Sequence, residues 1–225
     1  MHTVLRQNPA KKERSINLLW ILLLLLLLSG GLYWLWPLLH RPHYVNLPPP
    51  ATGPWVAFGD SLTEGYGASE GHDYPTVLGQ HLGRKIVNLG RSGATTSDGL
   101  SRLPEVLDLK PQVVLLCFGG NDGLERLSRE RMFSNLGEII DRLHVAGSFV
   151  VLIGIRSTTL RDQNEKGFRQ LAKDKKVFYV PNILHGIFLK PVYMSDAVHP
   201  NDDGYRLIAE RLEKDLQPVI RKLER

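Results

Sequence analysis

The chain has 225 residues, of which 43% are hydrophobic and 23% are charged, and its formal net charge is +5. This length leaves room for one domain of ordinary size and a short additional segment. The charge is unevenly spread: residues 1–50 hold five Lys or Arg and one acidic residue, whereas residues 51–225 hold 23 basic and 22 acidic residues. Because the main part of the chain is nearly neutral, its composition does not support nucleic-acid binding.

The first predicted element is an uncharged stretch of 22 residues, Leu18–Leu39, which follows a basic tail of residues 1–17. As a helix it would be about 33 Å long, which is enough to cross the core of a bilayer. Four of the five basic residues precede it, so we predict a signal anchor with a cytoplasmic N-terminus and an extracytoplasmic domain. A cleaved signal peptide is the alternative, because residues 29–31 are small, as a cleavage site requires.

Residues 40–54 are rich in proline, with Pro48–Pro50 and Pro54 among them. This composition predicts a semi-stiff, polyproline-like linker between the transmembrane segment and a domain of residues 55–225. The single cysteine, Cys117, falls in an apolar run of that domain. We therefore expect it to fill the core, since it has no partner for an internal disulfide.

From residue 55 onward, short apolar runs alternate with amphipathic stretches. The predicted strands are Trp55–Phe58, Lys85–Leu89, Gln112–Phe118, Ser148–Ile153 and Lys176–Val180. The predicted helices are Pro75–Gly83, Thr96–Leu107, Arg129–Ala146, Asp162–Asp174 and Asp202–Leu216. Five strands separated by helices predict an α/β fold, a three-layer α/β/α arrangement with a parallel sheet covered by helices on both faces.

The first motif with chemical meaning is Phe58-Gly59-Asp60-Ser61-Leu62-Thr63-Glu64-Gly65, directly after the first predicted strand. A serine placed between a strand and a glycine-rich turn is held on a sharp bend with its hydroxyl exposed, which suits a nucleophile. Asp-Ser followed by glycines is also an ordinary turn sequence. Ser61 is therefore a candidate whose interpretation depends on further residues downstream.

Three further motifs supply those residues. Gly93, after the second strand, can present its backbone N–H to a bound group, and Asn121, after the third, can donate from its carboxamide to an oxyanion. Asp196 and His199 are three residues apart in a turn, so the carboxylate can hold Nδ1–H while Nε2 accepts a serine proton. Because strand ends in an open parallel sheet share one edge, these groups are expected to converge there.

These four motifs resemble those of the SGNH hydrolases, also called GDSL esterases/lipases, and in particular the bacterial acyl-CoA thioesterase/lysophospholipase/arylesterase group. The similarity covers about residues 55–216, nearly all of the predicted domain. It implies a flavodoxin-like strand order, 2-1-3-4-5. The chain departs from the group around Arg156 and Arg161, where the loop is shorter.

The resemblance and the residues together predict acyl transfer to Ser61, with His199 as general base and Asp196 orienting the imidazole. The backbone N–H groups of Ser61 and Gly93 and the side chain of Asn121 are expected to form the oxyanion hole. No metal or other cofactor is expected, and the expected partners are an acyl-ester or lipid substrate and the membrane. The substrate class stays open among simple esters, lysophospholipids, thioesters and acetylated sugars.

Two other functional classes compete with a hydrolase. A membrane-tethered binding module would not need all five of the predicted site residues. An acyltransferase acting on envelope carbohydrate would need an acyl donor and a site that excludes water. Four histidines lack a metal-ligand spacing or a nearby acid in the sequence and are expected to be structural or surface residues: His72, His81, His144 and His185.

Overall fold

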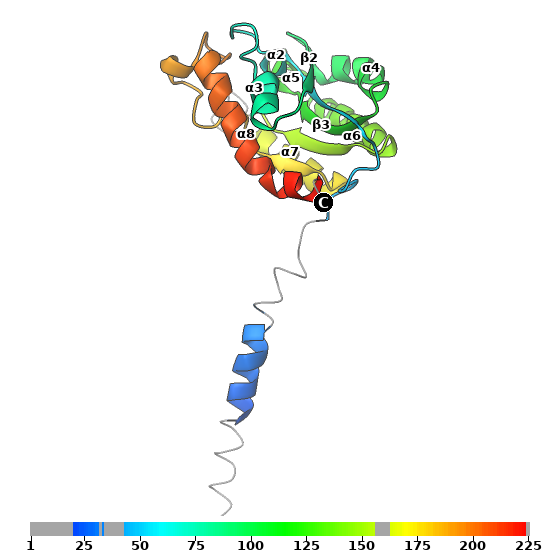
Figure 1. Ribbon diagram of the computed structural model, residues 1–225, viewed down its shortest axis with the longest axis vertical. Helices are drawn as coiled ribbons and strands as arrows, with labels where there is room; N and C mark the ends of the chain where they lie inside the picture. The colour runs from blue at the N-terminus through cyan, green and yellow to red at the C-terminus, as the bar shows by residue number, and fades with distance from the viewer. Residues whose placement is uncertain (1–19, 32, 34–42, 156–162, 224–225) are drawn as a thin grey trace, which may run out of the picture. The chain divides into compact units, whose positions relative to one another are not determined.

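The computed structural model describes residues 20–31, 33, 43–155 and 163–223. The chain divides into two compact units, Met1–Pro42 and His43–Arg225. In the first unit, residues 20–31 are helical (Figure 1). Within the described part of the chain, no helix combines the length and the apolar character needed to cross a bilayer. The predicted span, Leu18–Leu39, extends beyond the described residues at both ends, so it stays a prediction.

The second unit is built on a five-stranded parallel sheet with the order β2-β1-β3-β4-β5. Its strands are β1 (Gly53–Gly59), β2 (Ile86–Gly90), β3 (Pro111–Cys117), β4 (Phe149–Ile153) and β5 (Phe178–Val180). The strands are nearly continuous apolar runs, as expected for a parallel sheet buried on both faces. The predicted strand order and parallel pairing are confirmed.

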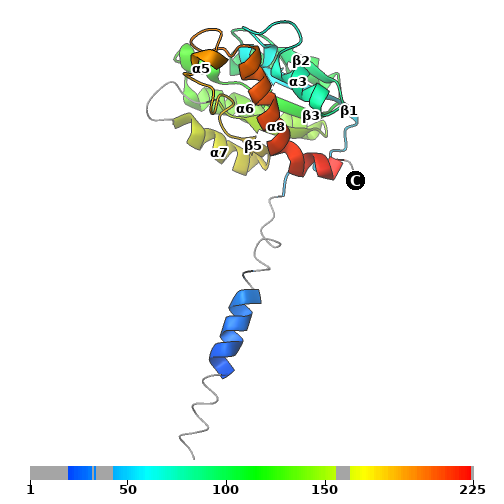
Figure 2. The same cartoon turned by 60° about the vertical axis from the view of Figure 1, so that its left-hand side comes forward.

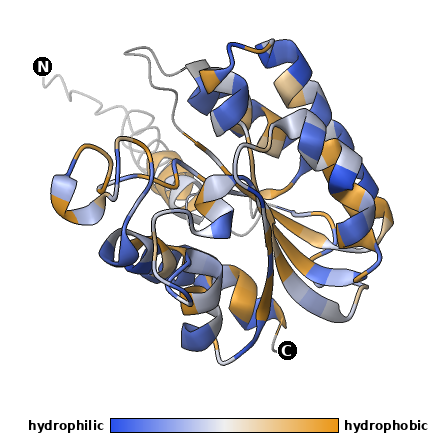
Figure 3. Cartoon of the chain, turned by 90° about the horizontal axis from the view of Figure 1, so that it is seen from above, coloured by the Kyte–Doolittle hydropathy of each residue, from blue (hydrophilic) through white to orange (hydrophobic). Residues whose placement is uncertain are grey.

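Helices cover both faces of the sheet, as Figure 3 shows from above. On one face α3 (Tyr74–His81) and α8 (Asp202–Leu223) enclose a core cluster that includes Cys117. On the other face α4 (Thr96–Leu107), α6 (Arg129–Val145) and α7 (Gln163–Lys175) enclose a second cluster. The buried residues of both clusters lie within residues 55–220. The second unit therefore contains a complete hydrophobic core of its own.

The proline-rich segment, predicted as a semi-stiff linker over residues 40–54, makes specific contacts with the domain. From His43 onward it belongs to the domain unit and is bonded to the edge of the sheet where the strands begin. The Asn46 side chain donates to the carbonyls of His144 and Ser148, and the Val45 N–H donates to the carbonyl of Lys176. The Tyr44 ring packs against Phe149 and Phe178. These contacts fix residues 44–53 across this edge of the domain.

The remaining boundaries follow the sequence closely, with three exceptions. The last helix continues past the predicted end at Leu216 to Leu223, because Val219 and Ile220 extend its buried stripe beyond Pro218. Two one-turn helices, α2 (Ser61–Glu64) and α5 (Gly120–Leu124), follow β1 and β3 directly. They are too short to show an apolar period, so the pattern analysis missed them. Both lie at the edge of the sheet that carries the candidate site.

Candidate active site

Ser61 is the first residue of α2, and the fold of that turn explains its position. The preceding residue, Asp60, caps the helix: its Oδ1 accepts a hydrogen bond from the Leu62 N–H at 3.0 Å. The Gly65 and Tyr66 N–H groups both donate to the Ser61 carbonyl, which closes the turn. The serine hydroxyl is thereby held at the carboxyl end of β1, where it lines a cavity of about 420 Å³.

His199 and Asp196 reach the serine from the segment between a 3-10 turn, η1 (Pro191–Tyr193), and α8. The His199 Nε2 lies 3.0 Å from the Ser61 Oγ, and its Nδ1 lies 2.7 Å from the Asp196 Oδ2. Asn201 anchors the end of this loop, because its Oδ1 accepts from the Gly204 N–H in the first turn of α8. The structure therefore brings together three residues that are up to 138 positions apart in the chain.

The second carboxylate oxygen of Asp196 accepts hydrogen bonds from the Val198 and His199 N–H groups, each at 2.8 Å. The bond from the Val198 N–H contributes most to lowering the pKa of Asp196, and the bond to the His199 ring comes next. Together with the other bonds they lower this pKa to about 2. The carboxylate is therefore ionised at neutral pH and holds the imidazole with its Nδ1–H toward Asp196. Nε2 is then the nitrogen that can accept the hydroxyl proton of Ser61.

The loop after β2 carries Gly93, which also lines the cavity and has a φ of +76°. That left-handed conformation is readily available only to glycine, and it turns the loop back toward α4. The loop is fixed at both ends, since the Arg91 N–H donates to the Gly59 carbonyl and the Ala94 carbonyl accepts from the Asn121 Nδ2 at 2.9 Å. Gly93 and Asn121 are thus held beside each other on the cavity wall.

Asn121 lies in α5, and a buried carboxylate fixes this short helix. Asp122 accepts hydrogen bonds from the N–H and the Oγ of Thr96, at 2.9 and 2.6 Å. Thr96 begins α4, so the bond ties the loop after β3 to the loop after β2. One Nδ2 hydrogen of Asn121 is used by Ala94, and the amide has a second hydrogen for a ligand in the cavity.

Asp60 is the second buried carboxylate of this region and is almost fully enclosed. Burial, reinforced by the nearby charge of Asp122, raises the pKa of Asp60 to about 7, although the bond from the Leu62 N–H acts in the opposite direction. Its contact with the Leu62 N–H supports the turn that carries Ser61. Asp60 is therefore a structural group whose charge changes near neutral pH.

Sequence reasoning missed three parts of the site. The Glu64 carboxylate accepts hydrogen bonds from both the N–H and the Oγ of Ser92, the residue before Gly93. The Tyr66 ring packs on the His199 ring, with centroids 4.5 Å apart. A wall of residues 182–189 closes one side of the cavity. Only Glu64 had a signal in the sequence, and its spacing from Ser61 is that of an ordinary helix cap.

Two secondary expectations have different outcomes. His81, expected to be a structural or surface residue, has its Nδ1 3.0 Å from the Glu213 Oε2 of α8. The distance along the chain concealed this pairing. Arg156 and Arg161, where the chain departs from the family pattern, lie outside the described residues.

The chain is similar in sequence to several known proteins. Residues 57–207 match a family model described as the GDSL-like lipase/acylhydrolase family. The chain is 34% identical over 174 residues to thioesterase 1/protease 1/lysophospholipase L1 of Escherichia coli K12, covering 73% of this chain and 84% of that protein. It is 32% identical to an arylesterase of Vibrio mimicus, covering 72% and 86%.

Solved structures show the same fold. The crystal structure of TesA superposes with a TM-score of 0.66 at 26% identity and covers 73% of this chain and 98% of that one. The esterase AlinE4, an SGNH hydrolase, superposes with a TM-score of 0.59 at 32% identity and covers 76% and 96%. The sequence match and the shared fold establish that this chain belongs to the GDSL-like lipase/acylhydrolase, or SGNH hydrolase, family.

Proposed function

We propose that the protein hydrolyses carboxylic esters through a triad of Ser61, His199 and Asp196. The observation that carries this proposal is the position of the His199 ring, which lies within hydrogen-bond distance of the serine hydroxyl on one side and of the carboxylate on the other. A nucleophile, a base and a group that orients the base are the three parts that acyl transfer requires.

In the first half-reaction the Ser61 Oγ attacks the carbonyl carbon of the ester while His199 Nε2 takes the hydroxyl proton. The tetrahedral intermediate collapses when the imidazolium returns that proton to the leaving alcohol or thiol, and the acyl group stays on Ser61. In the second half-reaction water attacks the acyl-enzyme with His199 again as base. The products are the free carboxylic acid and regenerated serine.

The negative charge of each intermediate forms on the former carbonyl oxygen. We propose that the N–H groups of Ser61 and Gly93 and the Nδ2 of Asn121 donate to it. Support comes from the loop geometry, because all three residues line the same cavity and Asn121 is bonded to the residue after Gly93. Preorganised donors of this kind are each worth about 3–4 kcal/mol of activation free energy.

The cavity favours a substrate with an apolar acyl part. The side chains of Leu124, Leu184 and Phe188 line it together with Ser61 and His199, and Leu124 is 58% exposed at its margin. A lysophospholipid or an acyl thioester therefore fits our proposal as well as a simple ester does. The E. coli relative carries thioesterase and lysophospholipase in its name, and the Vibrio relative carries arylesterase.

We also propose that Leu18–Leu39 anchors the protein in a membrane with the catalytic domain on the extracytoplasmic side. The support is the uncharged length of this segment and the four basic residues that precede it. An extracytoplasmic site would act on lipid or envelope esters. Mass spectrometry of the mature protein from membranes decides between this anchor and a cleaved signal peptide, since cleavage after residues 29–31 would remove most of the segment.

Ester hydrolysis by wild type and Ser61→Ala tests the catalytic proposal. We expect turnover of p-nitrophenyl esters by the wild type and its loss in the variant, and chain lengths from C2 to C16 separate an acetyl-esterase from a lipid-directed enzyme. A folded wild type with no turnover at any chain length would contradict the proposal. That outcome would favour an acyltransferase or a binding module instead.

A further inference from the structure

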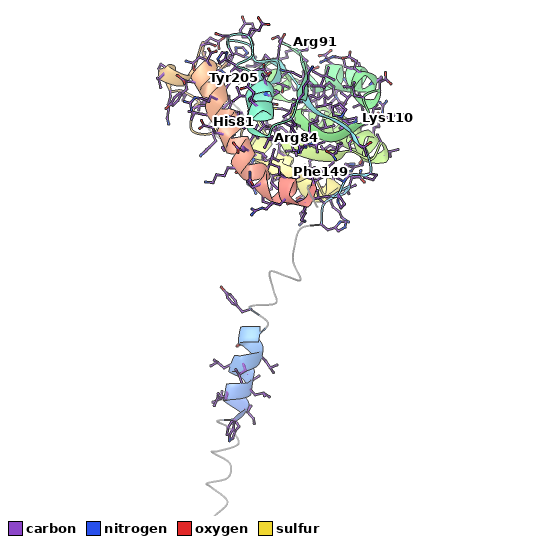
Figure 4. All side chains as sticks on the ribbon, viewed as in Figure 1. His81, Arg84, Arg91, Lys110, Phe149 and Tyr205 are labelled. Carbon is purple, nitrogen blue, oxygen red and sulfur yellow. The ribbon has the colours of Figure 1, made fainter. Side chains whose placement is uncertain are left out.

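The two edges of the parallel sheet carry opposite charge. The site edge is made by the described loops that follow the strands, residues 60–73, 91–95, 118–128 and 181–201. These loops hold seven acidic and three basic residues: Asp60, Glu64, Glu70, Asp73, Asp122, Glu125, Asp196, Arg91, Arg126 and Lys190. Even with Asp60 neutral, this edge is negative. Arg91 marks it at the top of Figure 4.

The opposite edge, where the strands begin, is positive, and we call it the basic rim. It comprises residues 82–85, 108–110, 173–177 and 221–223. These segments hold eight basic and two acidic residues: Arg84, Lys85, Lys110, Lys173, Lys175, Lys176, Arg221, Lys222, Asp108 and Asp174. One of the bases, Lys175, is paired with Asp141 of α6. The excess of positive charge remains large after that pair is removed.

The folded chain brings these four segments to one edge. Lys85, Lys110 and Lys176 come just before β2, β3 and β5, whose starts share an edge because the sheet is parallel. Leu223, at the end of α8, packs against the same core cluster as Tyr44 and Leu47. Figures 1 and 2 both place the C-terminal end of α8 beside the beginning of the domain.

The domain starts at the same edge. His43 is the first residue of the domain unit, and the segment that follows is bonded to the Lys176 carbonyl at Val45 and to the Lys110 carbonyl at Gly53. Only three residues separate the uncharged stretch Leu18–Leu39 from His43. A chain that leaves a bilayer there reaches the domain at the basic rim, and the candidate active site lies at the other edge of the sheet.

The rim also contains a hollow suited to an anionic group. A cavity of about 450 Å³ is lined by Arg84 and Lys85 and by the polar side chains of Thr76 and Gln80. The Arg84 guanidinium stacks over the Trp55 ring, 4.7 Å from its centroid. Its Nε is buried and has no hydrogen-bond partner among the described residues. A phosphate in the cavity would therefore be held by the positive charges of Arg84 and Lys85 rather than by this enclosed nitrogen.

We propose that the basic rim is a surface for anionic phospholipid headgroups, with the Arg84 hollow accepting a headgroup phosphate. Clusters of Lys and Arg beside a membrane segment are attracted to anionic lipid within about a Debye length. Contact through this rim orients the domain with its active-site cavity away from the supporting bilayer. This proposal rests on the membrane anchor proposed above. Lipid binding by the domain can nevertheless be measured without that anchor.

Vesicle flotation of the unit formed by residues 43–225 tests the proposal, because this unit contains its complete core and lacks the hydrophobic stretch. The probes are vesicles of phosphatidylcholine alone and with 30% phosphatidylglycerol. We expect binding to the anionic vesicles only, and weaker binding as salt is raised. Reversing four exposed rim charges, with Lys85→Glu, Lys110→Glu, Lys176→Glu and Lys222→Glu, should lower the affinity at least about tenfold.

A matched control reverses four exposed bases outside the rim, with Arg126→Glu, Arg131→Glu, Lys166→Glu and Lys190→Glu, and so changes the net charge equally. We expect it to bind within about twofold of wild type, because only charges within a Debye length of the lipid contribute strongly. Equal loss in both variants, unchanged binding of the rim variant, or no preference of wild type for anionic vesicles would overturn the proposal.

Hydrolysis of a soluble short-chain ester is measured in parallel, and thermal melts check that each variant is folded. We expect the rim variant to hydrolyse that ester at the wild-type rate, since its substitutions lie at the far edge of the sheet. Loss of lipid binding with retained hydrolysis separates the two proposals. Lipid binding without hydrolysis would remove the catalytic proposal and leave the lipid surface in place.

Discussion

Asp60 makes the stability of the domain depend on pH in a direction that can be calculated. Its pKa is raised from 3.8 to about 7 in the folded state, mainly by burial. Below pH 3.8 the folded and unfolded states are both protonated. As the pH rises from there to about 7, the unfolded state releases this proton while the folded state retains it, so the free energy of unfolding falls. A shift of about three units corresponds to about 4 kcal/mol across this window.

Asp60→Asn removes this dependence. The amide oxygen of asparagine can still accept from the Leu62 N–H, so the cap of α2 is retained. We expect the variant to be more stable than wild type by up to about 4 kcal/mol at pH 8, and the difference to shrink as the pH falls toward 4. The sign of this difference follows from the raised pKa, because at high pH folded wild type must ionise a buried carboxyl, which lowers its stability.

Urea denaturation of residues 43–225 at several pH values between 4 and 8 measures this difference. Using the variant as reference cancels the titration of the other groups, which both proteins share. A stability difference that is independent of pH would show that Asp60 titrates normally. A difference that grows as the pH falls would mean that folding lowers the pKa of Asp60, the opposite of the sign expected here.

Three further predictions concern catalysis and the core. Asn121→Ala should lower kcat about 10²–10³-fold, measured with a short-chain ester, because it removes one oxyanion donor; an unchanged kcat would exclude that role. Glu64→Ala should lower kcat about tenfold or more with little change in KM, because Ser92 loses its support, and Glu64→Gln should restore it; equal defects in both would contradict positioning by hydrogen bonding. Leu143→Ala should cost about 2–5 kcal/mol of unfolding free energy, against about 0.5 or less for the 91%-exposed Val145→Ala on the same helix.

Most of the fold and the meeting of the five predicted residues could be predicted from the sequence, for one physical reason. Ser61, Gly93 and Asn121 each follow an apolar run directly, and the carboxyl ends of parallel strands share an edge. The Asp196 and His199 pair needed only its own local turn to be oriented. At these positions, the local sequence pattern and the topology of the sheet therefore predict the same placement of the side chains.

The parts that could not be predicted depend on contacts between distant segments. Asn46 satisfies carbonyl groups 98 and 102 residues away, and nothing in a proline-rich sequence indicates that bond. Glu64 holds Ser92 from a position that looks like a helix cap. The Tyr66 ring meets His199 only after the sheet has formed. Such contacts are set by the three-dimensional arrangement of the loops, which periodicity does not encode.

In the proposed mechanism, Ser61 carries the acyl group during turnover. Rapid acid quenching of the wild type with a p-nitrophenyl ester, followed by peptide mass spectrometry, tests it most directly. We expect an acyl adduct on the peptide that contains Ser61, formed within the burst of nitrophenol release and absent from Ser61→Ala. An adduct on another residue, or the same adduct in Ser61→Ala, would contradict it.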